Sequence, residues 1–152
     1  MLPRQYPGQN CSIARTLEIV GDRWTLLIVR EALRGAARFD GLAASLDVAK
    51  NILADRLARL TEEGILERRT YQDRPLRQEY VLTAKGHGLR PVLAAMMDWG
   101  DRYYAPDGPP RLVLHEGCGG HVTSSLVCGE CGQSWPGIHL KTVAGPGSPR
   151  AE

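Results

Sequence analysis

The sequence predicts a mainly α-helical α+β protein, and three observations support this fold class. Its 152 residues are 43% apolar and 24% charged, which suits one domain of common size with a small appendage and excludes a large multidomain enzyme. Phe occurs once among nine aromatic residues, so the core must consist mainly of Leu, Val, Ile and Ala, which favour helices packed on helices. The helical periodicity gives way after Gly64 to a pattern typical of strands.

Two helices are predicted near the start of the chain. The first covers residues 12–20, with Ser12 as a candidate cap, Gly21 as its end, and apolar residues at spacings of four and three (Ile13, Leu17 and Val20). The second covers residues 24–33 and begins after Asp22, a second candidate cap. Its nearly continuous apolar character marks it as the buried helix of the domain.

A short helix within residues 37–48 and a longer one within residues 49–66 follow. In the first, apolar side chains face inward (Phe39, Leu42 and Leu46), and a brief turn around Asp47 leads into the second. There an apolar stripe recurs at helical spacing (Leu53, Leu57, Leu60 and Gly64). The opposite side is predicted to face solvent (Asn51, Asp55, Ala58 and Glu62).

A hairpin is predicted next, with strands at 65–71 and 78–82 and a turn at 72–77. Its tip is basic, because one acidic residue, Asp73, accompanies four arginines (Arg68, Arg69, Arg74 and Arg77). The first 105 residues also carry the whole positive balance of the chain, 16 basic against 13 acidic side chains. Any surface that faces phosphates should therefore lie in this part.

A long helix over residues 84–104, capped by Thr83, is the last predicted helix. It carries an apolar band that a small domain cannot cover alone (Leu89, Val92, Leu93, Met96, Trp99, Gly100 and Tyr103). This helix therefore predicts a partner.

Three short helices followed by an Arg-tipped hairpin describe a winged helix-turn-helix. This geometry places one helix in a DNA major groove and the hairpin tip against adjacent phosphates. Lys50 and Asn51 stand where the candidate recognition helix begins, and Asn is a natural bidentate reader of adenine. The predicted DNA-binding residues are Arg38, Lys50, Asn51, Arg56, Arg59, Arg74 and Arg77. For any single arginine, an ordinary solvated helix face remains the alternative.

Residues 11–104 resemble a known family, the HxlR-type winged helix-turn-helix transcriptional regulators, which are relatives of the MarR group. Four segments carry the resemblance: CSIARTLEIVGDRWTLLIVRE from Cys11, RFDGL from Arg38, LADRLARLTEEGILER from Leu53, and EYVLTAKG from Glu79. The resemblance implies homodimers that bind double-stranded DNA at roughly palindromic operators. It implies base and phosphate contacts by the recognition helix (Lys50, Asn51 and Arg56) and the wing (Arg74 and Arg77), and a dimer interface formed by the first and last helices.

Cys11 occupies the position that serves as an oxidant or electrophile sensor in some members of this family. It precedes a predicted helix, and Arg15 follows one turn later, so the helix dipole and a cation could both favour the thiolate. A small apolar residue buried at the dimer interface is the other interpretation. The effector is thus expected to be an oxidant or a small molecule.

The residues after the Pro/Gly linker at 105–112 include three cysteines, and we predict a zinc-ribbon-like β module over 112–140. Its predicted ligands are Cys118, His121, Cys128 and Cys131, a Cys₃His set in two pairs at x₂ spacing. The first pair departs from the usual Cys-x₂-Cys, the spacer is short, and His115 competes with His121. A ribbon-like hairpin without metal, or a flexible tail, are the alternatives. The Gly/Pro-rich residues 141–152 are predicted to be disordered.

An enzyme is not expected. The Cys/His pattern departs from the zinc deaminase signature, and Gly117–Gly120 lacks the Lys-Ser/Thr of a phosphate loop. No run of about 18 apolar residues and no apolar signal core is present. We therefore do not expect membrane insertion or export, and we expect a cytoplasmic location. The main alternative function is a protein-interaction scaffold that uses the winged domain and the Cys-rich tail without binding DNA.

Overall fold

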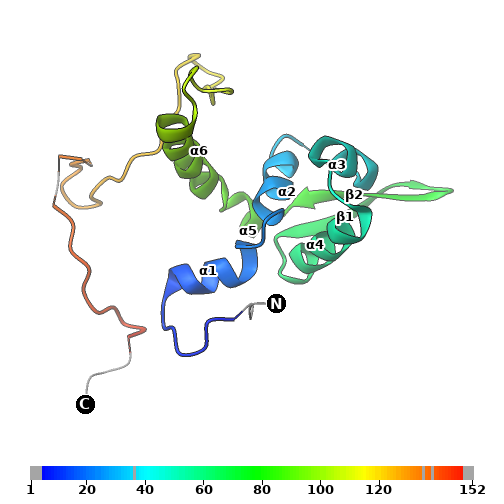
Figure 1. The fold of residues 1–152 in the computed structure, drawn as a ribbon, viewed down its shortest axis with the longest axis horizontal. Coiled ribbons are helices and arrows are strands. Elements are labelled where there is room, and N and C mark those ends of the chain that lie inside the picture. Colours follow the sequence, from blue (N-terminus) through cyan, green and yellow to red (C-terminus); the bar gives the residue numbers. More distant parts are fainter. Residues whose placement is uncertain (1–4, 36, 135, 138, 149–152) are drawn as a thin grey trace. The chain divides into compact units, whose positions relative to one another are not determined.

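The structure is a computed structural model that describes residues 5–35, 37–134, 136–137 and 139–148 (Figure 1). The chain separates into two compact units, Met1–Leu93 and Ala94–Glu152. The elements, in chain order, are α1 (Ser12–Val20), α2 (Thr25–Ala32), α3 (Phe39–Leu46), α4 (Lys50–Glu62), β1 (Leu66–Asp73), β2 (Leu76–Leu82), α5 (Ala84–His87) and α6 (Arg90–Tyr104).

The core of the first unit lies between α2, α3, α4 and the base of the hairpin. The side chains that are fully buried there are mostly aliphatic (Ile28, Val29, Leu53, Leu57, Leu60 and Leu66). Leu53, Leu57 and Leu60 are the stripe expected on α4, so the helical period in the sequence correctly predicted the buried side of this helix. Burial of this apolar surface is the main force that holds the unit together.

The α3–turn–α4 segment has the geometry of a helix-turn-helix. Asp47 ends α3 in the left-handed conformation with φ of 48°, and Val48 is buried in the turn. Asp tolerates this backbone conformation better than most residues. Gly64 lies beyond the end of α4 with φ of +66°, so it ends the helix and does not extend the apolar stripe as expected.

The wing is the antiparallel hairpin of β1 and β2, paired from Leu66↔Leu82 at its base to Asp73↔Leu76 at its tip, with an irregularity between Thr70 and Gln72. It projects well beyond α3 and α4 (Figure 1). Both strands are longer than expected, and the turn is reduced to Arg74 and Pro75, joined by a cis peptide bond.

Two backbone hydrogen bonds attach the base of the wing to the chain before α3. Ala37 and Tyr80 exchange them at 2.9 and 2.7 Å. The segment that enters the helix-turn-helix is therefore fixed to the same hairpin that forms the wing.

The predicted helix caps have mixed outcomes. Thr83 caps a helix as expected, since its Oγ1 accepts from the Gly86 N–H at 3.1 Å. Ser12 does not cap α1, because the N-cap position belongs to Cys11. Asp22 does not cap α2, whose N-cap is Trp24.

The predicted helix over 84–104 is two helices. The four-residue α5 ends before Gly88, and α6 begins at Arg90. Pro91 explains the break, because it has no N–H to donate to the His87 carbonyl and its ring would clash with that carbonyl in a continuous helix.

The second unit consists of most of α6 and the residues that follow it. No α6 residue is buried. The Asp98 carboxylate accepts hydrogen bonds from the backbone N–H and the hydroxyl of Ser124, which attaches the tail to the helix. These bonds hold the pKa of Asp98 below its usual value.

The predicted ribbon module contains two isolated β-bridges, Leu114↔His121 and Val127↔Ser134, and no longer strand among its described residues. Residues 141–148 contain no helix or strand, and the last part of the predicted disordered tail, 149–152, lies outside the described residues. Within the described parts of the chain, no helix combines the length and the apolar character needed to cross a bilayer.

Candidate nucleic-acid interface

The start of α4 presents an open, polar surface. Lys50 and Asn51 are both exposed, and so are Ala54 and Ala58 further along the same helix. Ala49 occupies the N-cap position without a side-chain cap, so its own side chain satisfies none of the first-turn N–H groups. Lys50 Nζ lies 3.8 Å from Asp40 Oδ1, a solvated contact of little strength.

Arg56 and Arg59, although on the same helix, are bound within the protein. Arg56 Nε lies 3.4 Å from Asp22 Oδ2, and Arg59 Nη1 lies 3.2 Å from the same oxygen. Arg59 also donates to the backbone carbonyl of Glu18. The two arginine side chains are only 14% and 20% exposed, so the structure assigns them to the junction of α4 with the first two helices.

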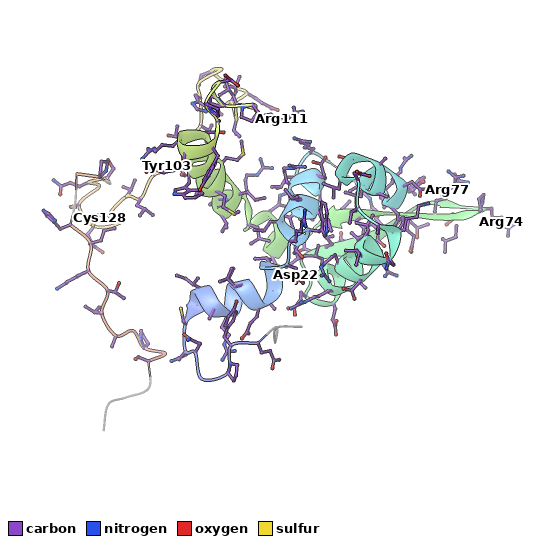
Figure 2. All side chains as sticks on the ribbon, in the orientation of Figure 1. Asp22, Arg74, Arg77, Tyr103, Arg111 and Cys128 are labelled. Atoms are coloured by element: carbon purple, nitrogen blue, oxygen red, sulfur yellow. The ribbon has the colours of Figure 1, made fainter. Side chains whose placement is uncertain are left out.

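The tip of the wing carries the two arginines expected there. Arg74 and Arg77 lie at the outer end of the hairpin (Figure 2), and both are exposed. Within the described part of the chain, neither guanidinium has an ion-pair partner. These two cations are therefore available to an anionic ligand.

The other two arginines of the wing have partners. Arg69 donates through Nε and Nη2 to Glu79 Oε1, at 2.9 and 2.8 Å, and Glu79 is buried. The Arg68 guanidinium lies 5.9 Å from the centre of the Tyr80 ring. Of these two, Arg69 has its charge paired and Arg68 rests on an aromatic ring, whereas the tip arginines have no such partner among the described residues.

Arg38 connects the helix-turn-helix with the wing. It stands at the N-cap of α3, and its guanidinium lies 4.1 Å from the centre of the Tyr71 ring on β1. Both residues are exposed. Cation–π stacking orients the guanidinium while its edges remain free to donate hydrogen bonds. Sequence reasoning had missed Tyr71, because nothing in the spacing of 38 and 71 indicates that they meet.

Two helices expose apolar side chains that none of the described residues covers. On α1 these are Ile13 and Leu17, exposed by 71% and 46%. On α6 they form a stripe at helical spacing (Val92, Met96, Trp99 and Tyr103), with the Trp99 and Tyr103 ring centres 5.4 Å apart. This stripe is the band that the sequence predicted to need a partner.

Cys11 is the N-cap residue of α1, so it precedes a helix as expected. Its side chain is half-buried. Arg15 does not turn toward the thiol, because its Nη1 pairs with Glu18 Oε1 at 3.0 Å. Glu18 also accepts from the Tyr6 backbone N–H, and this bond, together with Arg15, lowers the pKa of the Glu18 carboxyl.

The tail contains two close pairs of sulfur or nitrogen ligands. Cys128 and Cys131 form one pair, and backbone N–H groups of Cys131 and Glu130 that point at the Cys128 sulfur lower the pKa of that thiol. The other pair is His115 and Cys118, with Nδ1 and Sγ 3.2 Å apart. Across the described residues, no three His, Cys, Asp or Glu side chains meet closely enough to hold a metal. The four predicted ligands are therefore not brought together.

Comparison with known proteins places this geometry in a family. The family model described as HxlR-like helix-turn-helix matches residues 19–108. An uncharacterized HTH-type transcriptional regulator of Mycobacterium tuberculosis (strain ATCC 25618 / H37Rv) is 40% identical over 147 residues, which cover 96% of this chain and 92% of that protein.

Two solved structures share the fold over different lengths. The crystal structure of PA1607, a presumed transcription factor, is 37% identical with a TM-score of 0.69 and covers 95% of this chain and 91% of its own. The redox regulator HypR in its oxidized form is 28% identical with a TM-score of 0.57 and covers 60% of this chain and 96% of its own. The family match spans more than half of the residues and includes the whole helix-turn-helix and wing. The chain therefore belongs to the HxlR-like helix-turn-helix family of transcriptional regulators.

Proposed function

We propose that this regulator binds double-stranded DNA in a sequence-specific way, as a homodimer on a roughly palindromic operator. The observation that carries the proposal is the pairing of two exposed elements on one winged helix-turn-helix: the polar start of α4 and the unpaired arginines at the wing tip. A helix of this type enters the major groove while the wing follows the adjacent backbone.

Phosphate contacts are assigned to four cations that the protein leaves accessible: Arg38, Lys50, Arg74 and Arg77. Arg56 and Arg59 are left out of this set, because both are committed to Asp22. Contacts to phosphates provide most of the affinity of such proteins and weaken as salt rises.

Base recognition is assigned to the start of α4. Asn51 is exposed in its first turn, where side chains of a recognition helix reach base edges, and its amide can both donate to and accept from adenine. Ala54 and Ala58 keep the outward side of the helix small, which permits close approach to the groove floor.

The dimer is assigned to the apolar surfaces of α1 and α6. Exposed Ile13 and Leu17, and the stripe that includes Met96 and Trp99, need a partner of like character. A second copy of the chain provides it, and two-fold symmetry then matches the symmetry of a palindromic operator.

An oxidant or electrophile that modifies Cys11 is the effector we propose. The thiol stands at the N-cap of α1, a nine-residue helix, and is only half-buried, so part of its surface is open to a small reagent. The likeness to the redox regulator HypR supports the same assignment. The other interpretation keeps Cys11 as a small apolar residue at the interface.

The test compares binding of three variants to an operator and to scrambled duplexes, by fluorescence anisotropy at several salt concentrations. Arg74→Ala should weaken binding to every sequence and reduce the salt slope by about 1. Asn51→Ala should instead reduce discrimination at one base pair by roughly 1–3 kcal/mol. Arg111→Ala, which changes an exposed arginine of the tail, is the matched control and should behave like the wild type.

Two results would contradict the proposal. If Asn51→Ala leaves operator preference intact, α4 is not the recognition helix as placed here. If the wild-type chain does not bind duplex DNA at all, a protein-interaction scaffold becomes the better explanation of its function.

A further inference from the structure

The tail contains two turns that repeat the same local structure, and we call residues 114–121 the first knuckle and residues 127–134 the second. Each is closed by one β-bridge, Leu114↔His121 in the first and Val127↔Ser134 in the second. This common register allows the two knuckles to be compared position by position.

The hydrogen bonds of the two knuckles agree in the same register. The His115 N–H donates to the Gly120 carbonyl at 2.8 Å, and the Cys128 N–H donates to the Gln133 carbonyl at 2.8 Å. The reverse turn inside each is closed by a glycine at a positive φ. Gly119 donates to the His115 carbonyl at 2.7 Å with φ of +69°, and Gly132 donates to the Cys128 carbonyl at 3.0 Å with φ of +73°.

This equivalence identifies the ligand positions of the first knuckle. Cys118 corresponds to Cys131, and His115 corresponds to Cys128, the first cysteine of the pair. His121 corresponds to Ser134, which lies beyond the turn in the second knuckle. The register therefore selects His115 in place of His121 as the partner of Cys118.

Contacts inside the first knuckle agree with this choice. His115 Nδ1 lies 3.2 Å from Cys118 Sγ, so the imidazole and the thiol already converge. The Gly120 N–H also points at Cys118 Sγ, at 3.4 Å, as backbone donors do around metal-bound thiolates. A Cβ on Gly117 would lie 3.0 Å from His115 Cε1, so the lack of a side chain there leaves room for the ring.

His121 faces a different group. It lines a pocket with Asp98 and Ser124, whose side chains are hydrogen-bonded to each other. His121 thus belongs to the contact between the tail and α6.

We propose that the tail binds one Zn²⁺ through His115, Cys118, Cys128 and Cys131, and that the metal joins the two knuckles. Three cysteines and one histidine are a donor set that Zn²⁺ prefers in tetrahedral structural sites. The three thiols lose their protons to solvent as the three Zn–S bonds form, without any change of oxidation state.

The chain between the knuckles is long enough for all four ligands to reach one ion. Residues 122–126 can span roughly 17 Å when extended, at about 3.3–3.6 Å per residue, so they leave enough length to bring the four ligands around one ion. Since the described residues hold no cluster of three ligands, metal binding is the event that would complete the module, as in small zinc domains.

The test uses the full-length chain, purified under reducing conditions without added zinc. Zinc content is measured by mass spectrometry, and zinc affinity by competition with a chromogenic chelator. We expect one zinc per chain in the wild type and in His121→Ala. We expect His115→Ala and Cys131→Ser to weaken zinc binding by roughly 100-fold or more.

Co²⁺ substitution gives a second readout that does not depend on DNA binding. The wild type and His121→Ala should show the visible absorption of tetrahedral Co²⁺ with thiolate charge-transfer bands, and His115→Ala should lose or shift it. Circular dichroism checks that α1 to α6 remain folded in each variant. A wild type that takes up no metal after titration with Zn²⁺ overturns the site, and loss of zinc in His121→Ala overturns the choice of the fourth ligand.

Discussion

At the residue scale, Asp22 determines which arginines of α4 are available to a ligand. Its Oδ2 lies within 3.4 Å of nitrogen atoms of both Arg56 and Arg59. Among the described residues, the buried Arg56 Nε has no hydrogen-bond partner, and the Asp22 carboxylate, 3.4 Å away, is the negative charge that faces it from outside α4. Without that carboxylate, Arg59 would lose its ion pair and Arg56 would keep only the pair with Asp55 on its own helix, which is costly for largely buried cations.

Asp22→Asn should therefore destabilise the first unit although it changes few atoms. We expect the free energy of unfolding to fall by about 1–3 kcal/mol, because a partly buried charge pair loses one partner. Urea unfolding followed by circular dichroism measures the loss.

Asp40→Asn is the control for this change. Asp40 also faces a cation, Lys50, but at 3.8 Å and with both side chains well exposed, so the change should stay within about 0.5 kcal/mol. Equal losses in both variants would show that Asp22 does not hold α4 in place.

Cys11 provides a second prediction at this scale. If its thiol is the sensor, treatment with peroxide or a quinone should change the DNA affinity of the wild type and leave Cys11→Ser unaffected. Because Cys11→Ser keeps all three thiols of the tail, loss of the response in this variant assigns the response to Cys11. Mass spectrometry of the treated protein should find the modification on Cys11. A Cys11 thiol that stays unmodified would favour the interpretation as an apolar interface residue.

The outward position of Lys50 and Asn51 could be predicted from the sequence, because it depends only on the helical period. The pairing of Arg59 with Asp22 could not, since the two residues are 37 positions apart and meet only through tertiary packing. The stacking of Arg38 on Tyr71 was hidden for the same reason. In the tail, spacing alone allowed either His115 or His121 beside Cys118, and only the hydrogen-bond register distinguishes them.

At the element scale, helices with a buried stripe were the easiest to predict. The bounds of α1 agree with the sequence expectation, and α4 buries the side that its leucines indicated. The hairpin strands were underestimated because most of their side chains are exposed, so no alternation of apolar and polar residues marks their outer halves. The break between α5 and α6 was missed because the apolar band continues across Pro91.

The apolar stripe on α6 leads to a prediction about dimerisation at the element scale. Trp99→Glu places a charge in the middle of the exposed apolar side chains, so it should convert a dimer into monomers at micromolar concentration. Sedimentation velocity measures the change. Arg102→Glu adds negative charge to the same helix outside the stripe, and we expect it to remain dimeric. A wild type that is monomeric at the same concentration would remove the dimer from the proposed function.

At the scale of the whole molecule, the proposed DNA contacts lie in a different unit from most of the α6 stripe and from the proposed zinc site. The proposed DNA-binding residues Arg38, Asn51 and Arg74 lie in the first unit, whereas most of the α6 stripe, including Trp99, and the two knuckles lie in the second. The family model matches residues 19–108 and therefore ends before the Cys-containing tail.

The proposed two-fold dimer predicts the form of the operator. Selection of bound duplexes from a random library should return two inverted half-sites whose centres are about 10 base pairs, or roughly 34 Å, apart, because two α4 helices related by a two-fold axis enter successive major grooves. Inserting five base pairs between the half-sites turns one of them to the opposite side of the duplex. The wild type should then lose most of its affinity, while the monomeric Trp99→Glu variant, which reads one half-site at a time, should bind both spacings equally. If the wild type is also indifferent to the insertion, the two copies do not read the DNA as one symmetric unit.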